Sequence, residues 1–396
     1  MLQEGKKEVQ KLTKRKFGYK YLLAFTQNSK SIGVLLIACT ILSLVLTNCT
    51  QSNIFKEFWT KELTHNIYFP ESIEGWVNDG FMAVFFFYAG LEIKKEILEG
   101  ELNSLKKAAL PIFSAFGGVI FPAVIYFYFN KNSVFGGGWG IPTATDIAFS
   151  LGIASLFSAK LFPASLRVFL TALAIVDDLI AVLIVAIFYG GNISLFWFVI
   201  SLLVLLFSFL ILKKKNNNIL ILIVGVVLWF AVFQSGIHAT LAGVLLAFCI
   251  PVRKIALLMG KLHVAVNFVI VPFFAIANTC IVIPAHFLSY FSHKLFLGIS
   301  LGLLVGKPLG ILLVARILVY LKWVKLPSGT DWNKMIGAGI LAGIGFTMSI
   351  FIATIAFKET ETQDIAKLGV LIGSSLSILI GYFWVKFFHR NVSPKK

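Results

Sequence analysis

The chain has 396 residues, of which 58% are hydrophobic and only 13% are charged. Soluble domains are about 45–50% apolar, so this composition excludes an ordinary soluble protein and indicates an integral membrane protein. A net charge of +17 would suggest nucleic-acid binding in a soluble chain, but the placement of the positive charges gives another explanation. The four cysteines lack paired spacing, so no disulfide or metal site is expected.

Twelve apolar runs follow a polar, basic arm at residues 1–30. A membrane-spanning helix needs about 20 residues, and several of the runs are shorter. The runs lie near 31–48, 77–91, 108–129, 140–158, 168–189, 194–212, 219–234, 237–250, 264–283, 295–321, 335–357 and 365–388. They predict an all-α fold with one transmembrane domain at 31–388 and a short tail at 389–396. The arm has no short apolar core followed by small residues, so no cleavable signal peptide is expected.

Lysines and arginines divide unevenly between alternate loops. An even number of spans places both termini on one side, and 28 of the 35 basic residues fall there, against six on the opposite side. Cytoplasmic loops carry an excess of Lys and Arg, so both termini are predicted to be cytoplasmic. The arm is expected to lie on anionic membrane lipid and not on nucleic acid. The longest external loop, 50–78, could hold a short hairpin, a dimer contact or no regular structure.

The run Gly140–Gly152 (GIPTATDIAFSLG) places a proline and polar side chains in the middle of an apolar stretch. Broken helices at membrane depth are tolerated only where protein or water satisfies the exposed backbone groups. Each helix end also carries about half an elementary charge. Thr145 and Asp146 suit the positive end of a half-helix, where their oxygens accept from free N–H groups. Asp146 is therefore either a cap alone or a cap that also belongs to an ion site.

Asp177 and Asp178 stand side by side in the otherwise apolar stretch 168–188, which is long enough to span a bilayer. An ionised carboxylate at membrane depth costs several kcal/mol, and intramembrane acids therefore usually mark an ion or proton path. Successive helix residues point about 100° apart. The two carboxylates are thus expected to face different surroundings, one a water-filled cavity and the other a cation.

Lys307 is the one basic residue within a predicted span, and Pro308 follows it. Proline removes a helix hydrogen bond, so a local kink is expected here. A buried ammonium needs an anionic partner or negative helix ends, or it loses its proton. Asp177 or Asp178 is the natural partner, while snorkelling to an interface is the alternative.

A second interruption is predicted at Gly337–Ile352 (GAGILAGIGFTMSIFI). Three glycines, Gly339, Gly343 and Gly345, precede Thr347 in this stretch. As in the first interruption, helix ends would lie within the membrane and would need protein or water partners.

Six stretches of the chain resemble the NhaA-type bacterial sodium/proton antiporters, in the order in which that family has them. These stretches are WVNDGFMAVFFFYAGLEIKKE, IPTATDIAFSLGIASL, FLTALAIVDDLIAVLIVAIFY, SGIHATLAGVLLAF, LVGKPLGI and GIGFTMSIFIATIAF. The resemblance implies twelve transmembrane helices, in which the third to fifth and the tenth to twelfth form inverted-topology repeats. It also implies that the fourth and eleventh helices are discontinuous and cross. Both interruptions predicted above fall in those two helices.

The resemblance also implies roles for individual residues. Asp178 matches the principal cation-binding carboxylate, and Asp177 matches its neighbour, which takes part in proton exchange and can pair with Lys307. Thr145 and Asp146 match the polar pair at the crossing. There Asp146 would offset positive helix ends and Lys307 negative ones.

Glu92, Glu96 and His238 fall in stretches that the family associates with its response to pH. Histidine changes charge near neutral pH, so His238 could sense pH or could serve as a polar contact between helices. The chain departs from the family in two places. The stretch MGKLHVAVNFVIVP has no acidic residue, and the external loop at 50–78 is short for the family's dimer hairpin.

These features predict a transporter, not an enzyme, that exchanges cytoplasmic Na⁺ or Li⁺ for external H⁺ across the bacterial inner membrane. Hard cations favour oxygen ligands, and protons would compete with them for the same carboxylates. Exchange of more than one proton per cation would make the cycle electrogenic. No cofactor is expected, and a homodimer is compatible with the family.

Two other kinds of membrane protein also use buried carboxylates or crossing helices. An intramembrane aspartyl protease also uses two carboxylates in the membrane, but its acids lie on separate helices and in a GxGD setting that this chain lacks. A sodium-coupled symporter of organic solutes, with similar crossing helices, is the alternative that remains open.

Overall fold

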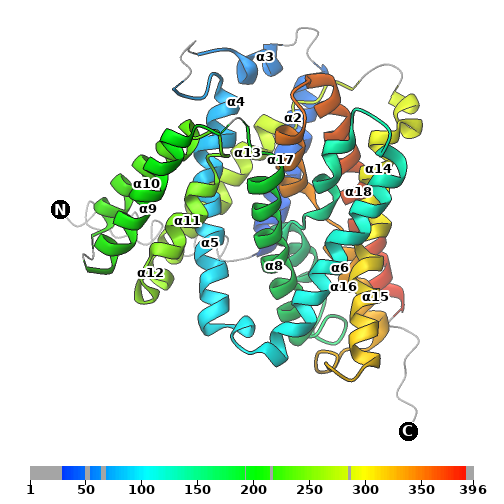
Figure 1. The fold of residues 1–396 in the computed structure, drawn as a ribbon. Helices are drawn as coiled ribbons and strands as arrows, with labels where there is room; N and C mark the ends of the chain where they lie inside the picture. The colour runs from blue at the N-terminus through cyan, green and yellow to red at the C-terminus, as the bar shows by residue number, and fades with distance from the viewer. Residues whose placement is uncertain are drawn as a thin grey trace, which may run out of the picture.

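The computed structural model describes residues 29–49, 54–63, 68–191, 193–214, 217–283 and 287–388. Most of these residues are helical (Figure 1). Within them, the only β pairing is one isolated antiparallel bridge between Glu62 and Ser72 in the predicted external loop. The all-α fold is therefore confirmed. The predicted basic arm, apart from Ser29 and Lys30, and the predicted tail at 389–396 lie outside the described residues.

The first half of the described chain ends with the helix that carries the paired aspartates. Its elements are α2 (Ser29–Cys49), α3 (Ile54–Thr60), α4 (Ile73–Gly75), the π-helical turn η1 (Trp76–Phe81), α5 (Met82–Glu99), the 3-10 turn η2 (Glu101–Asn103), α6 (Leu105–Asn130), the 3-10 helix η3 (Gly136–Thr143), α7 (Ile147–Ala154) and α8 (Ala164–Phe188).

The second half contains two more π-helical turns. Its elements are α9 (Leu195–Lys214), α10 (Asn218–Gln234), α11 (Leu241–Cys249), α12 (Val252–Ala265), the π-helical turn η4 (Val266–Ile270), α13 (Val271–Asn278), the 3-10 turn η5 (Phe287–Ser292), α14 (Lys294–Leu301), the π-helical turn η6 (Gly302–Gly306), α15 (Lys307–Tyr320), α16 (Trp332–Ala342), α17 (Phe346–Ala356) and α18 (Thr360–Phe387).

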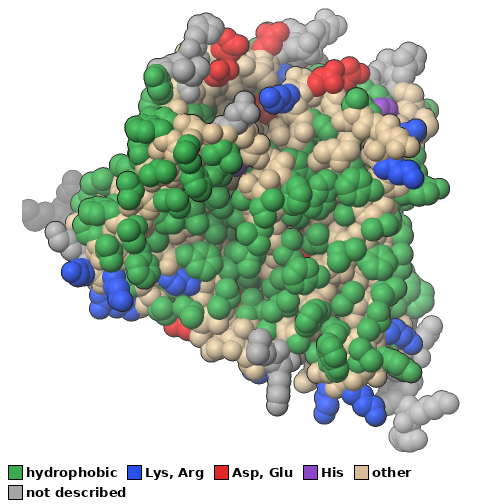
Figure 2. Space-filling view, viewed as in Figure 1, with side chains coloured by type: hydrophobic (Ala, Val, Ile, Leu, Met, Phe, Trp, Pro, Cys, Tyr) green, Lys and Arg blue, Asp and Glu red, His purple; other side chains and the backbone are tan. Residues whose placement is uncertain are grey.

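Among the described residues, seven helical segments are long and apolar enough to cross a membrane, or eight if α16 and α17 together count as one broken span. The face shown in Figure 2 carries a broad belt of hydrophobic side chains, with Lys and Arg mostly along its lower edge and Asp and Glu mostly at the top. An apolar belt between two polar edges fits the hydrocarbon core of a bilayer. The chain is a multi-pass integral membrane protein.

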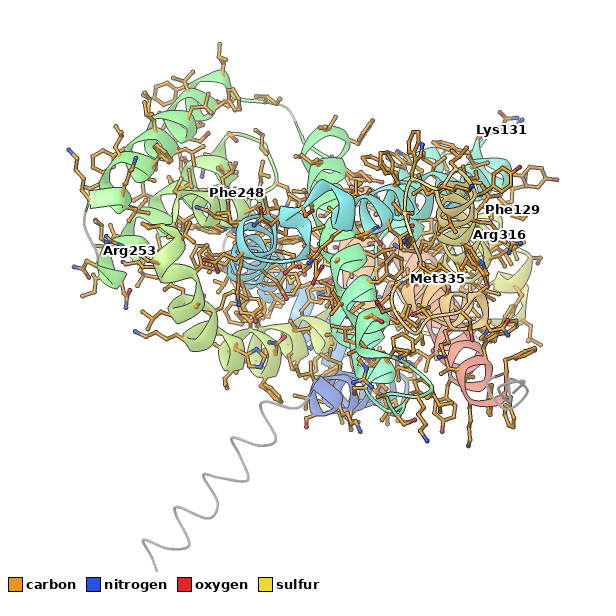
Figure 3. The ribbon with its side chains drawn as sticks, turned by 90° about the horizontal axis from the view of Figure 1, so that it is seen from below. Phe129, Lys131, Phe248, Arg253, Arg316 and Met335 are labelled. Atoms are coloured by element: carbon orange, nitrogen blue, oxygen red, sulfur yellow. The ribbon has the colours of Figure 1, made fainter. Side chains whose placement is uncertain are left out.

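The helices pack into two groups. The larger hydrophobic core joins α2, α6–α8 and α13–α18, and the smaller one joins α9–α12. Helix α5 lies between them (Figure 1) and contributes Phe86 to the larger core and Phe87 to the smaller. Seen from below, Arg253 of α12 lies on the opposite side of the molecule from Arg316 of α15 (Figure 3). The interrupted helices and the paired aspartates belong to the larger group.

One helix pair in each group is held at backbone contact by glycine. A Cβ atom on Gly310 of α15 would lie 2.0 Å from the carbonyl oxygen of Gly117 in α6, and a Cβ atom on Gly243 of α11 would lie 2.1 Å from the carbonyl oxygen of Ala83 in α5. No side chain fits at such separations. Small residues at helix crossings allow this close packing in membranes.

The predicted span at 264–283 starts too late. In the structure the helix begins with α12 at Val252 and continues through η4 into α13. The first turns of α12 carry Arg253, Lys254 and Lys261, and these basic residues interrupt the apolar run from which the prediction was made. The segment is amphipathic, so an apolar run alone does not mark its start.

A simple proline kink was predicted at Pro308. The structure instead has the π-helical turn η6 directly before Lys307 and Pro308. The amide of Lys307 donates to the carbonyl oxygen of Gly302, five residues earlier, and Pro308, which has no N–H, then occupies the first turn of α15. A π-bulge commonly occurs at functional sites. Here it leads directly into the buried lysine.

Candidate ion-binding site

The first interrupted helix leaves helical geometry at residues 144–146. Helix η3 ends at Thr143, Ala144 and Asp146 are extended, and α7 begins at Ile147. Asp146 Oδ1 accepts from the amide of Phe149 at 3.0 Å. This side chain thus caps the N-terminus of α7 and satisfies one of its free N–H groups.

The second interrupted helix breaks at Gly343–Gly345, between α16 and α17, with a bend of 40°. A Cβ atom on Gly343 would lie 2.6 Å from the carbonyl oxygen of Leu303, so the break passes too close to its neighbour for a side chain. The amides of Gly345 and Phe346 each donate to Ser374 Oγ at 3.2 Å. Neighbouring side chains therefore satisfy the backbone groups that the break exposes.

The two breaks meet at Asp146. Its amide donates to the carbonyl oxygen of Ile344 at 2.7 Å. Its Oδ2 accepts from the amide of Thr347 at 3.0 Å and also from the Thr347 hydroxyl. One carboxylate, only 2% exposed, thus serves the N-terminal ends of both α7 and α17. Two positive helix ends face one negative charge.

The opposite, negative helix ends face Lys307 and Thr145. The ammonium of Lys307 donates to the carbonyl oxygen of Thr143, where η3 ends. The Thr145 hydroxyl lies 3.0 Å from the carbonyl oxygen of Ala342, where α16 ends. The positive helix ends therefore face the Asp146 carboxylate, and the negative helix ends face the Lys307 ammonium and the Thr145 hydroxyl.

Asp177 lies in a fully buried ion pair. Its Oδ2 is 2.9 Å from Lys307 Nζ, and both side chains are completely shielded from solvent. The Thr145 hydroxyl donates to the same oxygen at 2.6 Å. Taking two charges out of water is costly, and the additional hydrogen bonds from Thr145 and to Thr143 are what such a pair needs to be stable.

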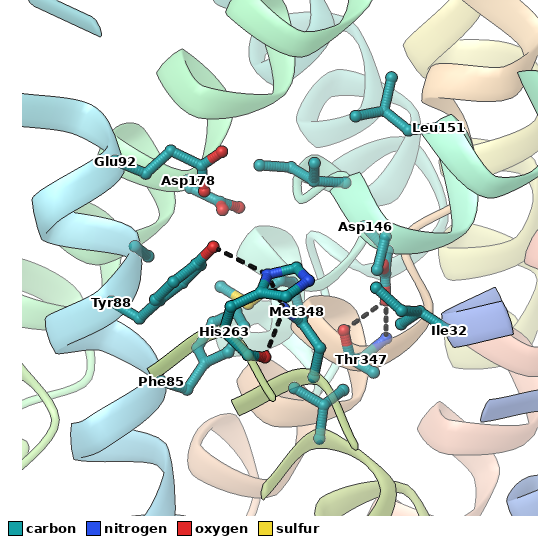
Figure 4. Close-up of a pocket in the computed structure, with 15 residues that line it drawn as sticks. Ile32, Phe85, Tyr88, Glu92, Asp146, Leu151, Asp178, His263, Thr347 and Met348 are labelled. Carbon is teal, nitrogen blue, oxygen red and sulfur yellow. Dashed lines mark hydrogen bonds between the residues drawn. The ribbon is translucent and has the colours of Figure 1, made fainter. Parts of the chain in front are cut away.

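Asp178 faces a different environment. Its Oδ1 is buried and has no hydrogen-bond partner among the described residues, and its carboxylate lines a cavity of about 150 Å³. Glu92 and Asp146 line the same cavity, and Figure 4 shows Glu92 and Asp178 together on one side with Asp146 and Thr347 across from them. A cavity with three carboxylates on its wall can attract and hold a cation. A transported cation there would be a substrate, not a resident metal.

The three residues expected in a pH response lie in three different places. Glu92 lines the cavity. Glu96 accepts from the amide of Glu101 at 2.7 Å, beyond the end of α5. His238 Nδ1 lies 2.9 Å from the Thr240 hydroxyl, and its ring packs edge-on against Phe351. Of these three residues, only Glu92 therefore lines the same cavity as Asp178.

Several polar residues of the site were not predicted. His263 Nδ1 lies 3.0 Å from Asn267 Nδ2 and 3.3 Å from the Tyr88 hydroxyl, and all three residues line the cavity. Asp79 Oδ1 lies 3.6 Å from His238 Nε2. The spacing of His263 and Asn267, four residues apart within an apolar helix, places both on one face. That spacing was the available sequence signal.

Carboxylates and a lysine buried beside two interrupted membrane helices define an ion-coupled secondary transporter. Within the part of the chain that the structure describes, no three His, Cys, Asp or Glu side chains are grouped as a resident metal site. The chain belongs to the Na+/H+ antiporter 1 family, whose family model matches residues 23–385. It is therefore a transporter and not an enzyme.

Curated relatives support this assignment over nearly the whole chain. The chain is 42% identical to the Na(+)/H(+) antiporter NhaA of Shewanella pealeana over 385 residues, which cover 94% of this chain and 97% of the relative. It is 43% identical to the antiporter NhaA of Flavobacterium psychrophilum, with 93% and 96% covered. It is 44% identical to NhaA 1 of Flavobacterium johnsoniae, with 92% and 96% covered. The resemblance to NhaA-type antiporters is confirmed.

Proposed function

We propose that the chain exchanges cytoplasmic Na⁺ or Li⁺ for external H⁺ across the bacterial inner membrane, with Asp178 as the principal cation ligand. The observation that carries this proposal is the contrast in partners at α8. Asp177 Oδ2 is paired with Lys307, whereas Asp178 lines the cavity and forms no ion pair among the described residues. Oδ1 of each aspartate has no hydrogen-bond partner there. The unpaired carboxylate is the one that a cation or a proton can reach.

Oxygen ligands around the cavity suit a hard monovalent cation. Asp178 supplies a free carboxylate, and Asp146 supplies negative charge from the opposite wall, although its oxygens already accept from two helix ends. The Thr145 hydroxyl lies 2.6 Å from Asp177 Oδ2 and can contribute its oxygen as a ligand if Asp177 turns toward the cation. Cation and protons then compete for the same negative charges, and this competition couples the two gradients.

The buried ion pair provides a second exchangeable charge. When a cation approaches Asp178, its charge repels the Lys307 ammonium and attracts Asp177, so the pair is weakened. If Lys307 or Asp177 changes protonation together with Asp178, two protons move for each cation. The cycle is then electrogenic, and the membrane potential drives cation export.

We extend the proposal to the architecture and orientation. Each of the twelve predicted apolar runs overlaps a helical segment of the structure, which supports twelve spans. The order long helix, interrupted helix, long helix occurs at α6, η3–α7 and α8, and again at α14–α15, α16–α17 and α18, which supports a repeated unit. The excess of Lys and Arg on one edge (Figure 2) supports cytoplasmic termini. Glu92, Glu96 and His238 are proposed to adjust activity with pH.

Reconstitution into liposomes tests the function. With an acidic interior and no organic solute, addition of external Na⁺ or Li⁺ should release protons and dissipate the pH gradient. Imposing a membrane potential should change the rate if the cycle is electrogenic. Liposomes that contain the Asp178→Asn variant are the matched control. A requirement for an organic solute would instead establish the sodium-coupled symporter, and no sodium-dependent proton movement by folded protein would overturn antiport.

A further inference from the structure

A large cavity lies at the lower edge of the molecule, where α6 begins and α15 ends (Figure 1). Its volume is about 590 Å³. A water molecule takes about 30 Å³, so the cavity has room for a group much larger than an ion. The N-terminal parts of α6 and α8 line it, together with the loop at 322–328 between α15 and α16. It is separate from the ion-binding cavity, because no described residue lines both. We call this space the loop cavity.

The loop cavity carries an excess of positive charge. Lys107, Lys322 and Lys325 line it, whereas Glu101 is the only acid among its lining residues. Lys107 Nζ lies 3.6 Å from Glu101 Oε2, and both side chains are well exposed, so this ion pair is weak. The side chains of Lys322 and Lys325 form no ion pair or hydrogen bond among the described residues. Their charges are therefore available to an anion that enters the cavity.

The starts of α6 and α8 add to this positive potential. These helices have 26 and 25 residues, and no side-chain hydrogen bond caps the start of either one. The free N–H groups at a helix start carry about half a positive charge and readily bind phosphate groups. Lys107 and Ser165, in the first turns of α6 and α8, both line the loop cavity. Two positive helix ends and three lysines therefore meet at one space.

Lys322 occupies a backbone position that usually belongs to glycine. Its φ of +60° is the only positive value at a non-glycine residue in the part of the chain that the structure describes. The amide of Lys322 donates to the Val319 carbonyl oxygen, and that of Trp323 donates to the Leu318 carbonyl oxygen, each at 3.1 Å. These two bonds form a Schellman motif at the end of α15, in which glycine is the common residue at this position. A side chain is disfavoured there, and such strain is typical of functional sites.

The side chains next to Lys322 indicate that the loop cavity lies at the membrane surface. Tyr320 and Trp323 are 84% and 70% exposed, and these two residue types gather where the hydrocarbon core meets the lipid headgroups. Lysines extend from this level toward the phosphates. Apolar side chains, including those of Leu110 and Phe169, complete the lining of the cavity. A lipid can therefore place its headgroup among the lysines while its apolar part stays beside apolar side chains.

We infer that the loop cavity binds the phosphate-bearing headgroup of an anionic phospholipid, with Lys107, Lys322 and Lys325 as its charged ligands. The inference rests on the proposed function only for the orientation, which assigns the lipid to the cytoplasmic leaflet, where anionic lipids give a negative surface potential. The bound headgroup would join α6 and α8, from the first helix triplet, to the loop at 322–328, from the second. A ligand that binds only the folded chain stabilises it.

Lipid titration tests this site without measuring transport. The full chain is purified in detergent, depleted of lipid and titrated with dioleoylphosphatidylglycerol. Dioleoylphosphatidylcholine, which has the same acyl chains but no net charge, and inorganic phosphate are titrated separately. Native mass spectrometry measures the affinity for each lipid, and thermal unfolding measures the stabilisation. The charge-removal variant carries Lys107→Gln, Lys322→Gln and Lys325→Gln. The matched control variant carries Lys160→Gln, Lys214→Gln and Lys386→Gln, at three exposed lysines of separate segments that do not line the loop cavity.

Phosphatidylglycerol should raise the unfolding temperature of the native chain and of the control variant, and phosphatidylcholine should not. One lysine near an anionic lipid contributes about fivefold to the affinity, so the charge-removal variant should bind phosphatidylglycerol at least about tenfold more weakly. Equal affinities of the two variants would overturn the site. An equal response to phosphatidylcholine would overturn recognition of the negative charge, and a full thermal shift with inorganic phosphate alone would overturn the assignment to a lipid.

A single substitution, Lys322→Gly, separates lipid binding from a purely structural role. Glycine adopts a positive φ without strain, so this variant should unfold at a higher temperature than the native chain when lipid is absent. It should nevertheless gain less stability from phosphatidylglycerol, because one charged ligand is lost. Lys322→Ala should show the same reduced gain without the higher starting temperature. An undiminished gain in Lys322→Gly would overturn the role of Lys322. Failure of sodium exchange would overturn the proposed function but would not alter lipid binding.

Discussion

The two sides of α8 give adjacent aspartates opposite environments. On one side Asp177 forms an ion pair with Lys307, accepts a hydrogen bond from the Thr145 hydroxyl and is fully buried. On the other side Asp178 lines the cavity that it shares with Glu92 and Asp146. The residue type is the same, and only the turn of about 100° per residue separates them. The difference shows how one helix can hold a charge that stabilises the structure next to a charge that remains available for exchange.

Asp178→Asn should have the largest effect, a complete loss of sodium-dependent proton flux. The amide keeps the size of the side chain but cannot exchange a proton for a cation. The variant should still insert and fold, because Asp178 Oδ1 has no protein partner to lose. Flux in liposomes and size-exclusion chromatography in detergent measure the two properties. Near-normal flux in folded protein would show that Asp178 is not the cation ligand.

Removal of one member of the buried pair should lower stability strongly. Lys307→Ala or Asp177→Asn leaves the partner without its counter-charge, and breaking a buried pair costs about 3–5 kcal/mol. The double variant should lose much less than the sum of the single losses, since residues in contact are not additive. Thermal unfolding of the four proteins at matched pH and sodium concentration measures the coupling.

Strict additivity would contradict the pairing and would leave Lys307 only as a partner of the Thr143 carbonyl. Asp178→Asn combined with Lys307→Ala is the matched control. No hydrogen bond or ion pair joins Asp178 to Lys307 among the described residues, so their coupling should be weak by comparison.

The pH dependence of sodium binding should separate the same two sides of α8. Protons compete with sodium for Asp178, so the apparent affinity should fall as pH falls, by up to about tenfold per pH unit for one proton. In Asp177→Asn the competition should persist, because Asp178 remains. Sodium titrations in detergent at several pH values measure it. An affinity independent of pH over the range of transport would contradict competition at one site.

Asp146→Ser should have a smaller effect. Serine can cap only one of the two helices that Asp146 now serves, and a lost cap costs about 0.5–2 kcal/mol. Loss of the charge should also weaken the apparent sodium affinity. Thermal unfolding and sodium-dependent flux measure the two effects. Unchanged affinity together with lower stability would show that Asp146 is a cap and not part of the ion site.

Thr145→Val should have the smallest effect, about 0.5–1.5 kcal/mol of stability for one hydrogen bond. The Thr145 hydroxyl donates to the Asp177 side of α8, so the loss should disappear in an Asp177→Asn background. Thermal unfolding with and without Thr145→Val, in the native and in the Asp177→Asn background, measures this loss of stability. A loss of the same size in both backgrounds would indicate that the contact with Ala342 matters more.

Short-range pattern was enough to predict much of this arrangement. Proline and polar residues near Asp146, and glycines before Thr347, marked the two interruptions, because backbone that cannot remain helical is visible in sequence. The isolation of Lys307 in an apolar run indicated a buried partner. The different directions of Asp177 and Asp178 followed from helix geometry alone.

Contacts between distant segments could not be predicted in the same way. The bond from Thr347 to Asp146 depends on how two breaks are placed in space, so sequence indicated one cap where the structure has two. The start of α12 was missed because its basic residues interrupt the apolar run. His263 became part of the site only because α12 packs beside α5 and brings it to Tyr88.

The shared cap at Asp146 has a consequence for the synthesis of the protein. Thr347 follows Asp146 by 201 residues, so at roughly 5–20 residues per second the ribosome needs about 10–40 s to supply the second helix end. During that interval α7 is in place while one oxygen of Asp146 awaits its donor. The crossing is therefore among the last parts of the molecule to be completed. A chain cut short before α17 would contain both paired aspartates but would lack the finished ion site.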